Sequence, residues 1–345
     1  MYKDRLVLDV HGHVSAPNAA YNVLMNMMGM NTPIPSPIPN RDAKRGATYE
    51  AFEESAAKHI AYIDERGIDV QVLGPRPYMQ FGWIEPHLTP AWTRYVNDMI
   101  QQQVDMYPDR FVGACQLPMI SWEKDTQHCV AELEHCVNER GFVAAYASPD
   151  ASGRREQPGM DSEWWYPIYE ACESLDVPII VHGTNTLDPR FRGIRANYQL
   201  AFLTEQYLAG QFLALSDVFE RFPKLRVIIC HCGGALNRFA PTDPHISQRD
   251  LSENLFYDSC GYDLTFLEAA IKQRSVPQMV FGTEAPGSGN HVRPDTGRTC
   301  DDLIPVLDSF DFLTDEDRIA ILHDNPLKVV PGFAKAGRMQ QAQQN

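Results

Sequence analysis

The chain has 345 residues, of which 44% are hydrophobic and 22% are charged, as is typical of a globular enzyme of one large domain or two medium ones. The formal net charge of −15 argues against nucleic acid as a partner, and an anionic substrate would need a local cluster of arginines. No basic-then-apolar leader precedes the first apolar run, and no run approaches the roughly 20 residues of a membrane span. We therefore expect a cytoplasmic protein without a membrane partner.

Eight short apolar runs alternate with longer helical patterns along the chain. The predicted strands are Leu6–His11, Asp69–Leu73, Phe111–Leu117, Phe142–Ala147, Pro178–His182, Arg226–His231, Leu255–Ser259 and Gln278–Gly282. The predicted helices are Tyr49–Arg66, Ala91–Tyr107, Lys124–Arg140, Ser162–Leu175, Tyr198–Arg221 and Leu264–Gln273. This alternation predicts the α/β class and a (β/α)8 TIM barrel. A doubly wound open sheet is the rival, but no Gly-x-Gly-x-x-Gly follows the first strand.

Two segments interrupt this rhythm of a single barrel domain over residues 1–331. Residues 14–48 follow the first strand and are rich in Met and Pro, which favours a lid-like insertion over the catalytic face. A surface loop or a subunit contact is the alternative. Residues 332–345 form a polar, Gln-rich C-terminal extension, either a docking helix or a frayed end.

The first strand carries the motif Asp9-Val10-His11-Gly12-His13. Side chains alternate along a strand, so Asp9, His11 and His13 are expected on one face. Two imidazoles one strand step apart can chelate one divalent metal. Asp9 would orient a ligand or be a buried acid with satisfied hydrogen bonds.

Other predicted strands also end in candidate ligands. Strand five ends in His182, strand six ends in His231, and Glu284 follows strand eight. In a (β/α)8 barrel the C-terminal ends of the strands form one catalytic face, so these residues should converge with His11 and His13. Histidines on helical patterns, such as His59, are expected to be surface or packing residues.

Taken together, these motifs resemble the amidohydrolase superfamily, in the branch that holds aminocarboxymuconate-semialdehyde decarboxylase and related decarboxylases and hydratases. The resemblance implies that His11, His13 and His182 are metal ligands and that His231 is the catalytic histidine. The strand-eight acid, usually Asp in this family, would be the last ligand. Here it is Glu284, and in this respect the chain resembles the 4-oxalomesaconate hydratases of bacterial aromatic breakdown.

The donor set and the resemblance together predict the cofactor. Three neutral imidazoles and one carboxylate suit Zn²⁺, with Mn²⁺ as the alternative. No Lys follows the fourth strand, where Ala147-Ser148-Pro149 stands, so a bridged pair of metals is not expected. We expect one ion per chain, with water activated for addition or attack.

The favoured reaction is the addition of water to the C=C bond of an unsaturated oxo-polycarboxylate, with His231 and Glu284 as the proton-handling residues. A non-oxidative decarboxylase of an aromatic or muconate-type acid, or a related hydrolase, is the alternative. The resemblance also implies a homodimer or a higher homo-oligomer. Because the substrate would be a small anion, arginines and hydrogen-bonding residues near the strand ends are the candidate substrate contacts. They are Arg76, Tyr78, Asn185, Arg192, Arg195, Tyr198, Arg238 and Arg293.

Overall fold

The computed structural model of the chain describes residues 1–33, 48–191, 193, 197–243 and 248–344. Eight parallel strands follow one another in chain order in one sheet. They are β1 (Leu8–His13), β2 (Val70–Gly74), β3 (Phe111–Gln116), β4 (Ala144–Ala147), β5 (Ile179–Val181), β6 (Val227–Ile229), β7 (Leu255–Asp258) and β8 (Met279–Val280). The backbone N–H of Val10 donates to the carbonyl of Phe281 at 2.9 Å, which joins the first and last edges into a barrel. The predicted (β/α)8 fold is confirmed.

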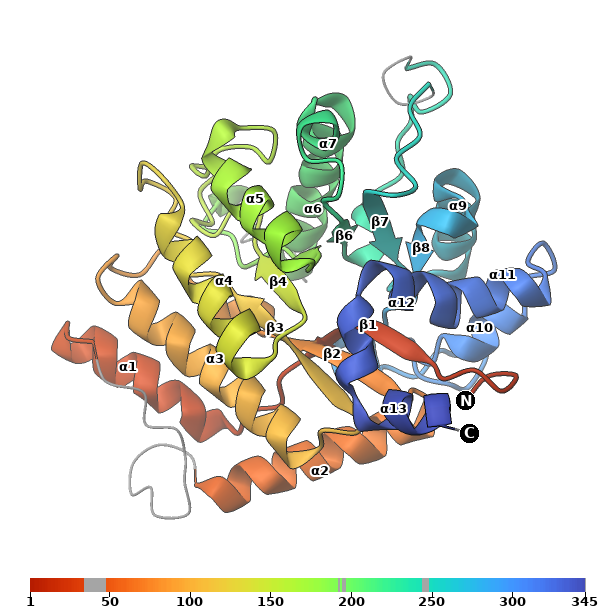
Figure 1. Cartoon of the computed structure of the whole chain (residues 1–345), viewed down its shortest axis with the longest axis horizontal. Helices are drawn as coiled ribbons and strands as arrows, with labels where there is room; N and C mark the ends of the chain where they lie inside the picture. Colours follow the sequence, from red (N-terminus) through yellow and green to blue (C-terminus); the bar gives the residue numbers. More distant parts are fainter. Residues whose placement is uncertain (34–47, 192, 194–196, 244–247, 345) are drawn as a thin grey trace.

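Helices surround the strands on the outside (Figure 1). The longer helices are α1 (Tyr21–Met30), α2 (Tyr49–Glu65), α3 (Thr89–Met106), α4 (Gln127–Arg140), α5 (Tyr166–Leu175), α6 (Asn197–Leu215), α9 (Leu264–Arg274) and α13 (Gly337–Gln344). Short helices are α7 (Val218–Arg221), α10 (Ile304–Asp308), α11 (Asp315–Ile319) and α12 (Asn325–Val329). In the described part of the chain, no helix combines the length and the apolarity needed to cross a membrane.

One predicted helix, Tyr198–Arg221, is divided in the structure into α6 and α7. The guanidinium of Arg249 donates to the carbonyl oxygens of Ala214 at 2.6 Å and Ser216 at 2.8 Å. Those carbonyls would otherwise accept hydrogen bonds in a continuing helix. The prediction of a single helix was wrong because a residue distant in sequence ends α6.

The strands separate two apolar cores because successive side chains point to opposite faces. On β5, Ile180 points into the barrel, whereas Ile179 and Val181 pack against the helices. The C-terminal segment continues the inner core, where Phe333 and Met339 are buried. Arg338 pairs with Asp69 at 2.9 Å, and the amino terminus pairs with the same carboxylate at 2.8 Å. Both ends of the described chain therefore lie against one end of the barrel.

The predicted lid is partly described. Helix α1 buries Met27 and exposes 66% of Met25, and the ring of Tyr21 lies 5.7 Å from that of Tyr78 after β2. The remainder of the predicted insertion, residues 34–47, lies outside the described residues.

Candidate metal centre

A β-bulge in β1 decides where its side chains point. Asp9 pairs with Gln71 and Gly12 pairs with Leu73, so β1 uses one more residue than β2 between these points. A Cβ on Gly12 would lie 2.3 Å from the Gln71 amide carbon, so a larger residue there would displace Gln71 from its hydrogen bonds to Asp9 and Ala285. The extra residue turns His11 and His13 toward the barrel interior and leaves Asp9 beside Gln71. The expectation that Asp9 shares a face with the two histidines was therefore wrong.

Three buried imidazoles are fixed through Nδ1. That atom of His11 donates to Asp258 Oδ2 at 2.6 Å, that of His13 to the carbonyl of Pro75 at 2.8 Å, and that of His182 to the carbonyl of Gly183 at 2.7 Å. Because each acceptor is an oxygen without a proton, Nδ1 carries the hydrogen and Nε2 keeps a free lone pair. The three Nε2 atoms are buried and have no hydrogen-bond partner among the described residues.

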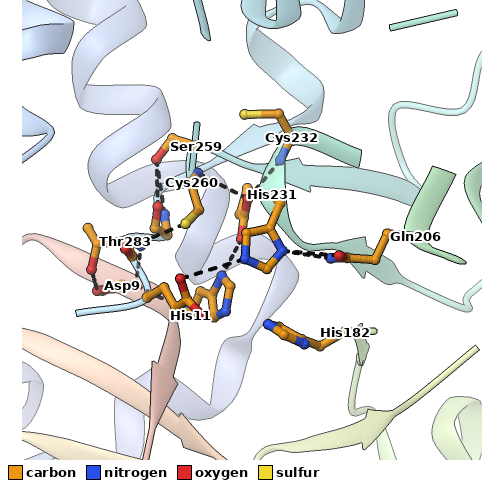
Figure 2. Close-up of polar contacts among 12 residues, drawn as sticks. Asp9, His11, His182, Gln206, His231, Cys232, Ser259, Cys260 and Thr283 are labelled. Atoms are coloured by element: carbon orange, nitrogen blue, oxygen red, sulfur yellow. Dashed lines mark hydrogen bonds and ion pairs between the residues drawn. The ribbon is translucent and has the colours of Figure 1, made fainter. Parts of the chain in front are cut away.

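The free nitrogens belong to rings that gather in one place. The centroids of the His11 and His13 rings are 5.1 Å apart, those of His11 and His182 5.0 Å, and those of His13 and His182 5.1 Å. His231 completes the group, 4.8 Å from the His182 ring, and Figure 2 draws His11, His182 and His231 facing one another. Ligating atoms of His11, His182, His231 and Glu284 all lie within 4.8 Å of one another. Buried lone pairs that converge without partners fit a bound cation.

Burial sets the protonation of two of these histidines. It lowers the pKa of His13 to about 4 and that of His182 well below its usual value. Both imidazoles are therefore neutral at pH 7, as a metal ligand must be.

Glu284 is held in an unusual backbone conformation beside the histidines. Its φ is 60°, and its N–H donates to the carbonyl of His11 at 2.8 Å. Its Oε1 lies 3.6 Å from His13 Nε2, and its Oε2 lies 3.7 Å from His231 Nε2. Burial acts to raise the pKa of Glu284, but the facing imidazoles of His13 and His231 bring it well below its usual value. Glu284 is thus an ionised carboxylate that can serve as a ligand.

His231 differs from the other three histidines in its surroundings. Its side chain is 12% exposed and lines a cavity, whereas that of His13 is 1% exposed. The amide nitrogen and oxygen of Gln206 on α6 lie 3.0 and 3.1 Å from its Nδ1 (Figure 2). An imidazole that is oriented at one nitrogen and open at the other can exchange protons with a substrate.

Two important residues were absent from the sequence prediction. Asp258 ends β7 and accepts hydrogen bonds from His11 and from the backbone N–H groups of Cys232 and Cys260. The rule that polar residues at strand ends form the site would have found it, had strand seven been included. Tyr262 donates to Glu284 Oε2 at 3.0 Å, but it lies in a loop whose course the sequence pattern does not reveal.

A buried hydrogen-bond chain supports the site from outside the barrel. His59 on α2 meets Gln71 Oε1 at 2.8 Å, and Gln71 Nε2 donates to Asp9 Oδ2 at 2.8 Å and to the carbonyl of Ala285 at 2.7 Å. Thr283 also donates to Asp9, at 2.6 Å. Burial raises the pKa of Asp9 to about 6. His59 is a packing residue, one of the two alternatives expected for it, and it connects α2 to the loop that carries Glu284.

Two cavities meet at Glu284. One, of about 300 Å³, is mostly apolar and is lined by residues that include Phe202, Leu203 and Phe266. The other, of about 390 Å³, is lined by residues that include Arg76 and Tyr78. Arg76 donates to the carbonyl of Val14 at 3.1 Å and has no acidic partner among the described residues. A guanidinium that lines the cavity and has no acidic partner among the described residues can pair with a carboxylate of a substrate.

The other candidate substrate contacts are less closely associated with these cavities. Asn185, Arg238 and Arg293 are not among the described residues that line either cavity. Arg293 pairs with Asp295 at 2.7 Å and also donates to the carbonyl of Tyr262. Tyr198 lies in the first turn of α6. Arg192 and Arg195 lie outside the described residues.

The fold and the histidine ring define a class of protein, and a model of the amidohydrolase family matches residues 8–332. The chain therefore belongs to the amidohydrolase family. Among characterised members, the 2-keto-4-carboxy-3-hexenedioate hydratase of Sphingobium sp. (strain NBRC 103272 / SYK-6) is 30% identical over 339 residues, which cover 94% of this chain and 96% of that protein.

Solved structures agree with this assignment. The crystal structure of 4-oxalomesaconate hydratase from Rhodopseudomonas palustris superposes with a TM-score of 0.82 at 25% identity, covering 99% of this chain and 100% of that one. A dihydroxybenzoic acid decarboxylase from Polaromonas sp. JS666, crystallised with manganese and an inhibitor, shares the fold with a TM-score of 0.68 at 21% identity, covering 95% of this chain and 97% of that one.

Proposed function

We propose that the chain is a metal-dependent hydratase that adds water to the C=C bond of an unsaturated oxo-polycarboxylate of the 4-oxalomesaconate type, in the breakdown of aromatic compounds. The observation that carries the proposal is the convergence, beside an ionised Glu284, of three imidazole nitrogens that have no hydrogen-bond partner in the described part of the chain. Similarity to two hydratases over nearly the whole chain supports the same reaction.

The metal would be held by His11, His13, His182 and Glu284, one ion per chain. Imidazole and carboxylate donors favour Zn²⁺, and Mn²⁺, which a decarboxylase of the same fold binds, is the alternative. Bound there, a divalent ion supplies Lewis-acid chemistry that activates water at neutral pH.

The remaining roles belong to the chain's own side chains. His231, open to the cavity and oriented by Gln206, accepts a proton from the attacking water. His231 passes that proton to the Glu284 carboxylate, which lies 3.7 Å from its Nε2, is ionised at rest, and delivers the proton to the substrate carbon next to the one that gains the hydroxyl group. The sum is the addition of one water, with the C=C π bond broken and one C–O and one C–H bond formed. Arg76 and Tyr78 bind a carboxylate of the substrate at the entrance.

Mass spectrometry of turnover tests this reaction directly. The zinc-loaded protein, incubated with 2-keto-4-carboxy-3-hexenedioate, is expected to give a product heavier by one water and to release no CO₂. A carboxylated phenol serves as the comparison substrate. Release of CO₂ from either substrate, without a hydrated product, would show that the protein is a decarboxylase and that the proposed hydration is wrong.

The other candidate substrate contacts, Asn185, Arg192, Arg195, Tyr198, Arg238 and Arg293, stay predictions. The homo-oligomer and the cytoplasmic location stay predictions as well.

A further inference from the structure

The two oxygens of the Glu284 carboxylate have different neighbours. Oε2 accepts hydrogen bonds from the hydroxyl of Ser288 at 2.7 Å and from the hydroxyl of Tyr262 at 3.0 Å. Oε1 has no hydroxyl donor among the described residues and lies 3.6 Å from His13 Nε2. The carboxylate is thus held at one oxygen and left free at the other.

The loop after β8, which carries Ser288 and packs against Tyr262, is built for this close contact. A Cβ on Gly287 would lie 2.2 Å from the carbonyl oxygen of Glu284 and 2.9 Å from its Cγ. A Cβ on Gly289 would lie 2.7 Å from Cζ of Tyr262. Both glycines therefore let the backbone wrap tightly around the two side chains.

Tyr262 is anchored independently of Glu284. Arg293 donates to its backbone carbonyl, and the guanidinium is itself fixed by Asp295 through two hydrogen bonds of 3.1 and 2.7 Å. The Tyr262 hydroxyl has one hydrogen to donate, and it lies closer to Glu284 Oε2, at 3.0 Å, than to the carbonyl of Thr283, at 3.2 Å. Because the backbone of Tyr262 is held by Arg293, its hydroxyl restrains Glu284 rather than following it.

We propose that Tyr262 and Ser288 are positioning residues that fix the Glu284 carboxylate, so that Oε1 faces the metal ligands while Oε2 is presented at the junction of the two cavities. Both Tyr262 and Ser288 line the apolar cavity, and Ser288 also lines the one that contains Arg76. The inference rests on the proposed function for its catalytic consequence, because a carboxylate free to rotate would not stay aligned with His231 and the substrate carbon. Its consequence for metal retention does not depend on the reaction.

The test uses the variants Tyr262→Phe, Ser288→Ala and their combination, with Ser288→Thr to restore a hydroxyl. Residues that hydrogen-bond to a metal-ligating side chain typically contribute 10- to 100-fold to activity or metal affinity. We expect kcat for hydration to fall about tenfold or more in each single variant, with KM within about threefold of the wild type. In Ser288→Thr most of kcat should return. Release of zinc to a chelator should be about tenfold faster in the double variant.

Tyr169→Phe is the matched control, since it removes a buried tyrosine hydroxyl that donates to the carbonyl of Met160 at 2.6 Å, far from Glu284 in the fold. It should leave kcat and zinc release unchanged. Wild-type zinc release and kcat in the double variant would overturn the proposal, and so would a rise in KM at constant kcat, which would make the hydroxyls substrate ligands. If the wild type fails to hydrate any substrate, the proposed function fails, and the zinc-release comparison still decides the positioning role.

Discussion

His13 and His231 approach the same carboxylate from two sides, but only one of them opens onto the cavity. His13 is buried, and its Nε2 has no hydrogen-bond partner among the residues that the structure describes, whereas His231 is partly exposed and lies beside Gln206. The set of three imidazoles and Glu284 whose ligating atoms all lie within 4.8 Å of one another nevertheless includes His231 and omits His13. Burial and the fixed Nδ1–H of His13 favour it as the ligand, and leave His231 for proton transfer.

Two substitutions distinguish these roles. His13→Asn should reduce bound zinc well below one ion per chain, because a ligand is lost. His231→Asn should keep one zinc per chain and lower kcat by about 100-fold or more, in line with the loss of an acid–base group. Metal analysis and steady-state kinetics measure both.

His135→Asn is the control, since His135 is a partly exposed residue that pairs with Glu139 on α4. Full zinc content in His13→Asn together with loss of zinc in His231→Asn would exchange the two roles.

Glu284 carries the second residue-scale prediction. Glu284→Gln keeps the size and shape of the side chain but replaces one acceptor oxygen by an NH2 donor, and so removes the proton-carrying carboxylate. We expect hydration to fall by about 100-fold or more. Glu268→Gln, on the exposed face of α9, provides the matched control. Hydration at the wild-type rate by zinc-loaded Glu284→Gln would exclude the carboxylate from proton transfer.

At the same scale, the sequence predicted the cluster of histidines but not the residues that hydrogen-bond to it. His11, His13, His182, His231 and Glu284 were found because each follows an apolar strand, and strand ends meet in a barrel. The direction of Asp9 could not be predicted, because one extra residue in β1 reverses its face. Tyr262 and Ser288 lie in loops, where no periodicity indicates which side chains meet.

At the scale of elements, α2, β2, β1 and the loop after β8 are joined by the chain from His59 through Gln71 to Asp9. The Nδ1 of His59 lies 2.9 Å from the Ser15 hydroxyl and 2.8 Å from the Gln103 amide nitrogen, so it acts as an acceptor. Burial lowers the pKa of His59 to about 3. The folded protein therefore keeps this imidazole neutral while the unfolded chain protonates it below pH 6.5.

This difference predicts a loss of stability in acid. Between the folded pKa of about 3 and the unfolded value of 6.5, the unfolded state binds more protons, so stability falls as the pH falls. Protonation of His59 in the unfolded chain alone should lower the free energy of unfolding by about 2 kcal/mol between pH 7 and pH 5. Denaturant unfolding of the zinc-loaded protein and of His59→Gln at both pH values measures the difference.

Between pH 7 and pH 5 the free energy of unfolding of His59→Gln should fall by about 2 kcal/mol less than that of the wild type, because glutamine does not titrate. Equal losses in the two proteins would mean that His59 is protonated in the folded state. The metal ligands titrate in both proteins, so their contribution cancels in the comparison.

The eight strands could be predicted because each is an apolar run bounded by Gly, Pro or polar residues. The end of α6 could not, because it depends on Arg249, a residue more than 30 positions away that takes the helix carbonyls. Local pattern thus predicted the order of the elements but not a boundary that a tertiary contact sets.

At the scale of the whole molecule, the barrel has two unlike ends. The C-terminal ends of the strands carry the histidines, and the opposite end is closed by the C-terminal segment, where Phe333 and Met339 are buried against the inner core. Residues that carry the chemistry and residues that stabilise the fold therefore lie at opposite ends of the barrel, as is usual for this fold.

Phe333→Ala tests this separation. The cavity it leaves should destabilise the fold by about 3 to 5 kcal/mol, seen as a lower Tm. Zinc content and kcat measured at 25 °C should match the wild type. Lys335→Ala, at an exposed position of the same segment, is the control. A wild-type Tm for Phe333→Ala would contradict the role of this segment in closing the barrel.

The central claim is that His11, His13, His182 and Glu284 hold one divalent ion. Anomalous diffraction from zinc-loaded crystals tests it most directly. We expect one peak per chain at about 2.0 to 2.1 Å from the Nε2 atoms of the three histidines, with a Glu284 oxygen at about 2.0 to 2.2 Å. A crystal with full zinc content and no peak at that point, or with its only peak between His11, Cys230 and Asp258, would contradict the account.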